Sequence, residues 1–220
     1  MLKYILLIPA ISYSVFASAQ VQVRDEPRHH NVFENEFVRI LDVYLGPKDT
    51  TLYHLHNTPS VFIIFTTTSV GSQLMGGQPQ KGANVNGVVD YDSLKTPRIH
   101  RVWNEDTSWF HVMDVELTST KQKNNIPTLQ NPFLKLLFNE QQVNGYNIDL
   151  RKGNTLDLPV SANGYLIVSQ TESVIDYKIN GITQHRIVKP AHYIWVEAGK
   201  SFSLLPKGDN TANFVLLQLK

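Results

Sequence analysis

Short apolar segments in which hydrophobic and polar residues alternate make up most of the chain after residue 30. Residues 37–45 end at Gly46 and Pro47, and residues 61–67 form a run of mostly apolar, β-branched and aromatic side chains. A period of two is typical of β-strands, and Gly, Pro, Asn and Asp at the boundaries are typical of turns. Comparable segments follow at 99–103, 109–117, 146–150, 165–169, 174–179, 193–196 and 214–219. Many short strands at close spacing predict an all-β sandwich or barrel.

The chain also repeats itself weakly, at an offset of about 105 residues. Residues 33–45 match residues 138–150, and the end of the first part, 115–117, matches 217–219. A repeat of this length predicts two consecutive units, residues 31–118 and residues 139–220. Residues 119–138 would then form the linker, and their first half is rich in Ser, Thr, Lys, Asn and Pro.

One segment at the end of this linker has a helical pattern. In residues 132–140, Asn131 could cap a helix and Pro132 suits the first helical position. The apolar side chains Phe133, Leu136 and Leu137 would share one helical face. The sequence therefore predicts a short connecting helix here.

Composition limits the function classes. The 20 Lys and Arg residues nearly balance the 19 Asp and Glu residues. The sequence has no cluster of basic residues, which argues against a nucleic-acid-binding protein. With 42% hydrophobic and 18% charged residues, the chain has the material for a substantial core. Cysteine is absent, which excludes disulfides, Cys-ligated zinc or iron–sulfur sites and thiol nucleophiles.

Residues 1–20 have the pattern of a signal peptide. Lys3 is followed by an apolar stretch at 4–16, and Ala17-Ser18-Ala19 matches a small-residue cleavage site. We expect export to a bacterial periplasm or the exterior, with no membrane segment after cleavage. An uncleaved membrane anchor is the alternative interpretation.

Two histidines in a His-x-His pattern, His54 and His56, precede the buried strand at 61–67. Side chains at i and i+2 on extended backbone point to the same face, where both imidazoles can meet one metal ion. A third candidate ligand, His100, lies on a later strand. The alternative is that these histidines are ordinary surface or hydrogen-bonded core residues.

These residues resemble the two conserved motifs of the cupin superfamily. The first motif is similar to Gly46, His54, His56 and Pro59 with the apolar run after them, and the second is similar to Pro97, His100 and Asn104. The two-unit organisation resembles that of bicupins. The resemblance implies two tandem cupin-type double-stranded β-helix (jelly-roll) barrels, with a metal held by His54, His56 and His100 in the first.

The chain departs from the cupin pattern in one respect. A Glu or Gln usually follows the second histidine by three or four positions, where this chain has Ser60 and Val61. Three neutral histidines suit a divalent transition metal such as Fe, Mn, Ni, Cu or Zn. Three-His cupins include thiol, diketone and gentisate dioxygenases, so the resemblance implies a metal-dependent dioxygenase acting on a small organic substrate. The alternative is a non-catalytic small-molecule-binding or structural cupin.

The predicted partners are accordingly a small-molecule ligand and, at most, a second copy of the chain. Counting 105 residues on from His54 and His56 reaches Pro159 and Ser161, and counting 102 on from His100 reaches Phe202. None of these side chains binds a divalent cation well, so we expect a degenerate second unit without a metal.

Two further regions of the first unit carry expectations. His111 shares a strand face with apolar residues that we expect to point into the barrel. It is interpreted as a hydrogen-bonded core residue, as a residue behind the metal ligands or facing the substrate, or as a further ligand. The glycine-rich residues 70–97 are interpreted as a flap over the barrel mouth or as a tolerated surface insertion. His29 and His30 follow the signal peptide in a polar segment and are expected to be solvated.

Overall fold

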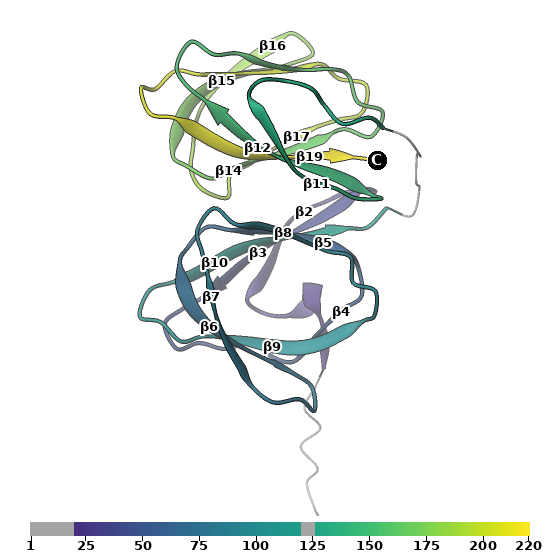
Figure 1. Cartoon of the computed structure of the whole chain (residues 1–220), viewed down its shortest axis with the longest axis vertical. Helices are drawn as coiled ribbons and strands as arrows, with labels where there is room; N and C mark the ends of the chain where they lie inside the picture. The colour runs from purple at the N-terminus through teal and green to yellow at the C-terminus, as the bar shows by residue number, and fades with distance from the viewer. Residues whose placement is uncertain (1–19, 120–125) are drawn as a thin grey trace, which may run out of the picture.

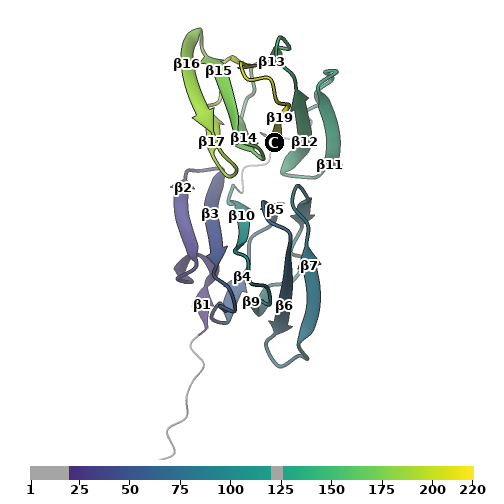
Figure 2. The same cartoon turned by 90° about the vertical axis from the view of Figure 1, so that its left-hand side faces the viewer.

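The computed structural model describes residues 20–119 and 126–220, which form two β-barrel units stacked along the long axis of the molecule (Figures 1 and 2). The predicted all-β fold with two tandem jelly-roll units is confirmed, because the described residues contain nineteen strands and no α-helix. None of the helical segments described is long and apolar enough to cross a membrane. The predicted signal peptide, apart from Gln20, and residues 120–125 of the predicted linker lie outside the described residues.

The first barrel consists of two five-stranded sheets, ordered β1-β4-β9-β6-β7 and β2-β3-β10-β5-β8. A short 3-10 helix, η1 (Val23–Asp25), follows the first strand. The strands are β1 (Val21–Gln22), β2 (His29–Glu34), β3 (Val38–Leu45), β4 (His54–His56), β5 (Ser60–Ile64), β6 (Thr68–Leu74), β7 (Gln80–Asn84), β8 (Val89–Asp92), β9 (Arg98–Asn104) and β10 (Phe110–Leu117). The barrel therefore begins with β1, ahead of residue 31.

The second barrel repeats this arrangement from β2 onward, and β1 has no counterpart among its described strands. Its sheets are ordered β13-β18-β15-β16 and β11-β12-β19-β14-β17. Each strand from β2 to β10 corresponds to the strand whose number is higher by nine, so that β2 corresponds to β11 and β10 to β19. The strands are β11 (Leu134–Asn139), β12 (Val143–Leu150), β13 (Leu156–Leu158), β14 (Tyr165–Ser169), β15 (Ser173–Ile179), β16 (Ile182–Val188), β17 (Tyr193–Val196), β18 (Phe202–Pro206) and β19 (Ala212–Leu219).

The two barrels share a hydrophobic core where their five-stranded sheets β2-β3-β10-β5-β8 and β11-β12-β19-β14-β17 face each other. Alternate residues of β10 divide between two cores: Phe110 and Val112 pack inside the first barrel. Met113 and Val115 pack instead against residues of the second barrel, including Leu217 of β19. Both faces of β10 are consequently buried, and all eight of its residues are shielded from solvent.

The predicted helix at 132–140 is wrong, because this segment is the edge strand β11. β11 pairs antiparallel with β12, and Phe138 packs across Gly145, where a Cβ atom would lie 2.2 Å from the Phe138 ring. Asn131 does make a capping-type contact, because its side chain accepts a hydrogen bond from the Phe133 amide at 3.0 Å, but this contact closes a turn rather than starting a helix. Pairing with β12 supplies backbone partners that override the local helical preference.

The interpretation of residues 70–97 as a flap or insertion is also wrong. These residues run through β6, β7 and β8, which are regular strands of the barrel with counterparts β15, β16 and β17 in the second unit. The glycines partly serve the connecting turns, where Gly76 and Gly87 have φ angles of 76° and 86°. Such positive φ angles favour glycine because it lacks a Cβ atom.

Candidate metal centre

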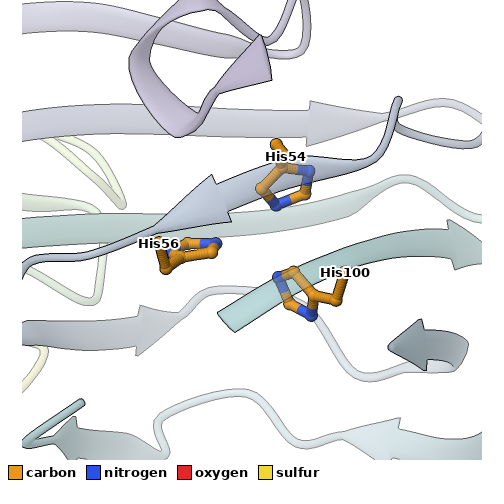
Figure 3. Close-up of side chains that lie close together, drawn as sticks. All are labelled: His54, His56 and His100. Atoms are coloured by element: carbon orange, nitrogen blue, oxygen red, sulfur yellow. The ribbon is translucent and has the colours of Figure 1, made fainter. Parts of the chain in front are cut away.

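Strands β4 and β9 bring the three predicted histidines together. The antiparallel register places His54 directly opposite His100, and His56 points to the same face two residues along β4. The ring centroids are 4.7 Å apart for His54 and His100, 4.9 Å for His56 and His100, and 5.0 Å for His54 and His56. One nitrogen from each ring lies within 4.8 Å of the other two (Figure 3). Three imidazoles thus surround one point in the barrel.

All three imidazoles are held in the neutral form by their surroundings. His54 and His56 are 1% and 3% exposed, and His100 is half-buried. Burial lowers the pKa of His54 to about 4, that of His56 to about 2 and that of His100 to about 3. The mutual repulsion of charged imidazoles adds to this effect for His56 and His100. Neutral rings keep a lone pair on one nitrogen, as a metal ligand requires.

The hydrogen bonds leave nitrogens free at the centre. His54 donates from Nδ1 to the Leu52 carbonyl at 2.9 Å, which leaves the Nε2 lone pair unused. Nε2 of His100 is buried and has no hydrogen-bond partner among the residues that the structure describes. A buried nitrogen without a partner is unfavourable unless something else binds it. The donor set therefore fits a transition metal.

A buried carboxylate, Asp114, lies beside this centre and was missed by the sequence analysis. It projects from β10 into the same cavity, with Oδ2 3.7 Å from Nδ1 of His56. Burial, and then the charge of nearby Glu116, raise the pKa of Asp114 to about 7. The available signal was an acidic residue in the middle of a mostly apolar strand.

His111 does not belong to the metal site, and of the sequence-based alternatives the hydrogen-bonded buried residue is the one that the structure shows. Its side chain lies on the opposite face of β10 from Asp114, where Nε2 contacts Oδ1 of Asp42 at 2.7 Å. The ring stacks on Tyr44 with a centroid distance of 4.0 Å and contacts Phe65 at 4.7 Å. The alternation along β10 was read correctly, but the face assigned to the barrel interior was wrong.

His29 was expected to be solvated, but its side chain is only 6% exposed and lies beside the site. Its ring centroid is 4.8 Å from that of His54, and Nδ1 donates to the buried carboxylate of Glu26 at 2.9 Å. Although burial raises the pKa of Glu26, hydrogen bonds from His29 and two backbone amides outweigh it, and the pKa is lowered. The expectation held for His30, which is exposed.

A cavity of about 290 Å³ adjoins the three histidines. Most of the area of its wall is apolar, and the polar side chains that line it beside the histidines are Thr51, Ser72, Asn84, Asp90 and Asp114. The apolar wall includes Val43, Leu45, Phe62, Ile64, Phe110 and Val112. A partly open cavity with a largely apolar wall on which polar groups converge is the usual form of a small-molecule site, and this one is at the small end of the range.

The second barrel has apolar side chains at the corresponding positions. Phe202 is the counterpart of His100, because it pairs with the last residue of β15 as His100 pairs with the last residue of β6. Leu158 of β13 lies directly opposite Phe202. Leu158 therefore occupies the position of His54, one residue before Pro159, which the repeat offset of 105 residues indicated. The side chains of Leu158 and Phe202 lie in the hydrophobic core of that barrel. The counterpart of His56 is Val160, which is exposed. The described part of the second barrel has no equivalent three-His group.

Comparisons with known proteins agree with this architecture. No family model matches the sequence, and no curated protein is detectably similar to it. The structure is similar to a cupin 2 conserved barrel domain protein from Leptotrichia buccalis, with a TM-score of 0.55 and 11% identity over 87% of this chain and 88% of that one.

Two further solved structures show the same likeness. Salicylate 1,2-dioxygenase from Pseudaminobacter salicylatoxidans has a TM-score of 0.60 and 11% identity, over 84% of this chain and 71% of that one. AerE from Microcystis aeruginosa has a TM-score of 0.60 and 6% identity, over 89% of this chain and 98% of that one. At these identities the likeness establishes the fold, which consists of two tandem cupin-type jelly-roll barrels.

Proposed function

We propose that this protein is a metal-binding cupin whose first barrel holds one divalent transition metal on His54, His56 and His100. The observation that carries the proposal is the convergence of three imidazoles, two buried and one half-buried, each held neutral. Three nitrogen ligands suit Fe, Mn, Ni, Cu or Zn, whereas Ca and Mg prefer oxygen ligands.

The reaction that fits this site best is oxygenation of a small organic substrate. When bound, a redox-active metal with three protein ligands supplies open positions at which an organic substrate and dioxygen can meet. The apolar wall of the cavity would hold the body of the substrate and exclude bulk water. His29, fixed through Nδ1 by Glu26, would present its other ring nitrogen to a polar group of the substrate. The dioxygenase among the structural neighbours supports this reaction class.

A non-catalytic small-molecule-binding protein is the second candidate. The observation that favours it is the small, mainly apolar cavity, which can bind a ligand by burial alone. Oxygen consumption separates the two candidates. The iron-loaded protein should consume dioxygen with at least one member of a panel of aromatic acids, thiols and diketones. Binding of a panel member without oxygen consumption would favour the second candidate.

The metal site itself is tested by elemental analysis of the purified protein. Wild type should carry close to one transition metal per chain after loading and desalting, and a His54→Ala/His56→Ala variant should carry almost none. His111→Ala is the matched control, because His111 lies in the same barrel on the opposite face of β10. Equal metal content in wild type and the double variant would refute the site.

Export is proposed from the sequence of residues 1–20. Expression of the full chain in a Gram-negative host should yield a periplasmic protein whose first residue is Gln20 or Val21. N-terminal sequencing and mass spectrometry measure this directly. A full-length protein retained in the cytoplasm would contradict the proposal.

A further inference from the structure

We propose that Asp114 is the positioning residue of the metal centre: its carboxylate accepts a hydrogen bond from Nδ1 of His56 and so directs Nε2 of His56 to the metal. The inference rests on the proposed metal site and adds a residue that lies outside the His-x-His motif. It also supplies the centre with a negative charge that the motif lacks, because Ser60 and Val61 stand where a carboxylate or carboxamide usually follows.

The geometry places Asp114 behind His56. Asp114 is 1% exposed and projects into the cavity from the sheet opposite β4. Oδ2 lies 3.7 Å from Nδ1 of His56, so a small side-chain rotation brings the pair to the distance of a charge-assisted hydrogen bond, about 2.7–2.9 Å. An imidazole that donates from Nδ1 to a carboxylate binds metal through Nε2, and the carboxylate raises its basicity.

The carboxylate of Asp114 is otherwise unpartnered. Neither oxygen makes a well-formed hydrogen bond to the described residues, and the nearby Ser60 hydroxyl donates to the Thr58 carbonyl. Ser60 and the charge of Arg98 favour the ionised form of Asp114, but they do not offset its burial. A buried carboxylate without a partner destabilises the fold, so a purely structural role does not explain it. A His56 ring polarised by a bound cation gives this carboxylate a close hydrogen-bond donor and adds positive charge beside it.

The second barrel provides an internal comparison. Asp114 pairs with Leu41 and Phe62, and the equivalent residue of β19, which pairs with Tyr146 and Ile167, is Leu216. Leu216 lies in the same hydrophobic core as Leu158 and Phe202, the counterparts of His54 and His100. The carboxylate and the histidines are thus absent together from the barrel without a metal site.

The neighbouring buried carboxylate behaves differently. Glu116 accepts a hydrogen bond from Arg39 at 2.7 Å, and the equivalent Gln218 accepts one from Asn144 at 2.9 Å. This position is therefore polar and paired in both barrels, which marks it as structural. Of these two buried acidic positions, only that of Asp114 changes from polar to apolar together with the histidines.

The experiment compares Asp114→Asn and Asp114→Leu with wild type in the full chain. The Leu variant copies Leu216, and Arg39→Asn/Glu116→Gln is the matched control because it copies the Asn144–Gln218 pair. Binding of Co²⁺ is measured by its visible absorption, and thermal unfolding is measured on the metal-free proteins. For Zn²⁺-loaded wild type, nitrogen NMR reports which ring nitrogen of His56 carries the proton.

We expect both Asp114 variants to bind Co²⁺ about 10–100-fold more weakly than wild type. Their metal-free melting temperatures should equal or exceed that of wild type, since an unpartnered buried charge is removed. The control should keep the wild-type affinity, and His56 of Zn²⁺-loaded wild type should carry its proton on Nδ1. A merely structural role would instead lower the melting temperature and leave the affinity of the folded protein unchanged.

Three results would overturn the inference in distinguishable ways. Unchanged Co²⁺ affinity in both Asp114 variants, with loss in His54→Ala/His56→Ala, would refute the role of Asp114 and leave the metal site intact. A change in cobalt coordination number in the Asp114 variants would make Asp114 a ligand rather than a positioning residue. Absence of Co²⁺ binding by wild type would refute both the proposed function and this inference.

Discussion

His54 and His100 face each other directly across strands β4 and β9, with their ring centroids 4.7 Å apart. In the second barrel Leu158 and Phe202 occupy the same cross-strand pair. One backbone register thus supports a cluster of metal-type donors in one barrel and a hydrophobic core in the other. At this pair the two barrels differ in side chains, so variants can give the first barrel the residues of the second.

The first prediction is that His54→Leu/His100→Phe, which copies the second barrel, folds and loses the metal. Because the variant removes the buried, unpartnered Nε2 of His100 and replaces two imidazoles by apolar side chains, the free energy of unfolding of the metal-free protein should rise by roughly 1–3 kcal/mol. Urea unfolding and Co²⁺ titration measure the two effects. A variant that keeps tight Co²⁺ binding would show that these histidines are not ligands.

The second prediction concerns acid stability of the metal-free protein. The three histidines have lowered pKa values in the folded state and an ordinary value of 6.5, so the unfolded chain binds up to three more protons below pH 6.5. Asp114 opposes this, since its pKa is raised from 3.8 to about 7 and the folded state binds one more proton there. The net difference is about two protons, so stability should fall as the pH falls from 6.5 to 4.5.

Each extra proton bound by the unfolded chain changes the free energy of unfolding by about 1.4 kcal/mol per pH unit. Two protons therefore change it by at most roughly 3 kcal/mol per pH unit. Urea unfolding at pH 7.0, 6.0 and 5.0 measures it. His54→Leu/His100→Phe leaves one histidine whose proton balances that of Asp114, so its stability should be nearly constant in this window. The same pH slope in both proteins would contradict the assignment.

The third prediction concerns Gly71 in β6, which packs against Trp103 of β9. A Cβ atom at Gly71 would lie 1.9 Å from the Trp103 ring, so Gly71→Ala forces the strand that carries His100 to shift. We expect the free energy of unfolding to fall by about 1–3 kcal/mol and Co²⁺ affinity to fall with it. The control, Gly82→Ala in the neighbouring strand β7, has nothing within 4 Å of the new Cβ and should have a much smaller effect on both.

The fourth prediction is that the two barrels unfold together. Leu217 is fully buried in the core that both barrels share, so Leu217→Ala should lower the free energy of unfolding by about 2–5 kcal/mol. Exposed Ile187 of β16 is the control, and Ile187→Ala should change stability by less than about 0.5 kcal/mol. Coincident urea transitions by tryptophan fluorescence and circular dichroism are expected, and two separate transitions would contradict a shared core.

The sequence by itself determined many of the strands, the tandem all-β fold and the three histidines that converge at the centre. Period-two alternation over 37–45 and 109–117 predicts strands, because in these segments the side-chain pattern and the sheet pairing agree. The i, i+2 spacing of His54 and His56 places both on one face of any strand. These properties are local, so they survive whatever the strand packs against.

Only the tertiary structure decided which face of β10 points into its own barrel and which faces the second barrel. Both faces of β10 are buried, one in its own barrel and one against the second barrel, so alternation alone could not separate Asp114 from His111. The segment at 134–139 became a strand because β12 offered an edge to pair with. His29 lies next to His54 because β1 and η1 bring the preceding chain alongside β4. Each of these outcomes depends on contacts between residues far apart in the chain, which no local pattern encodes.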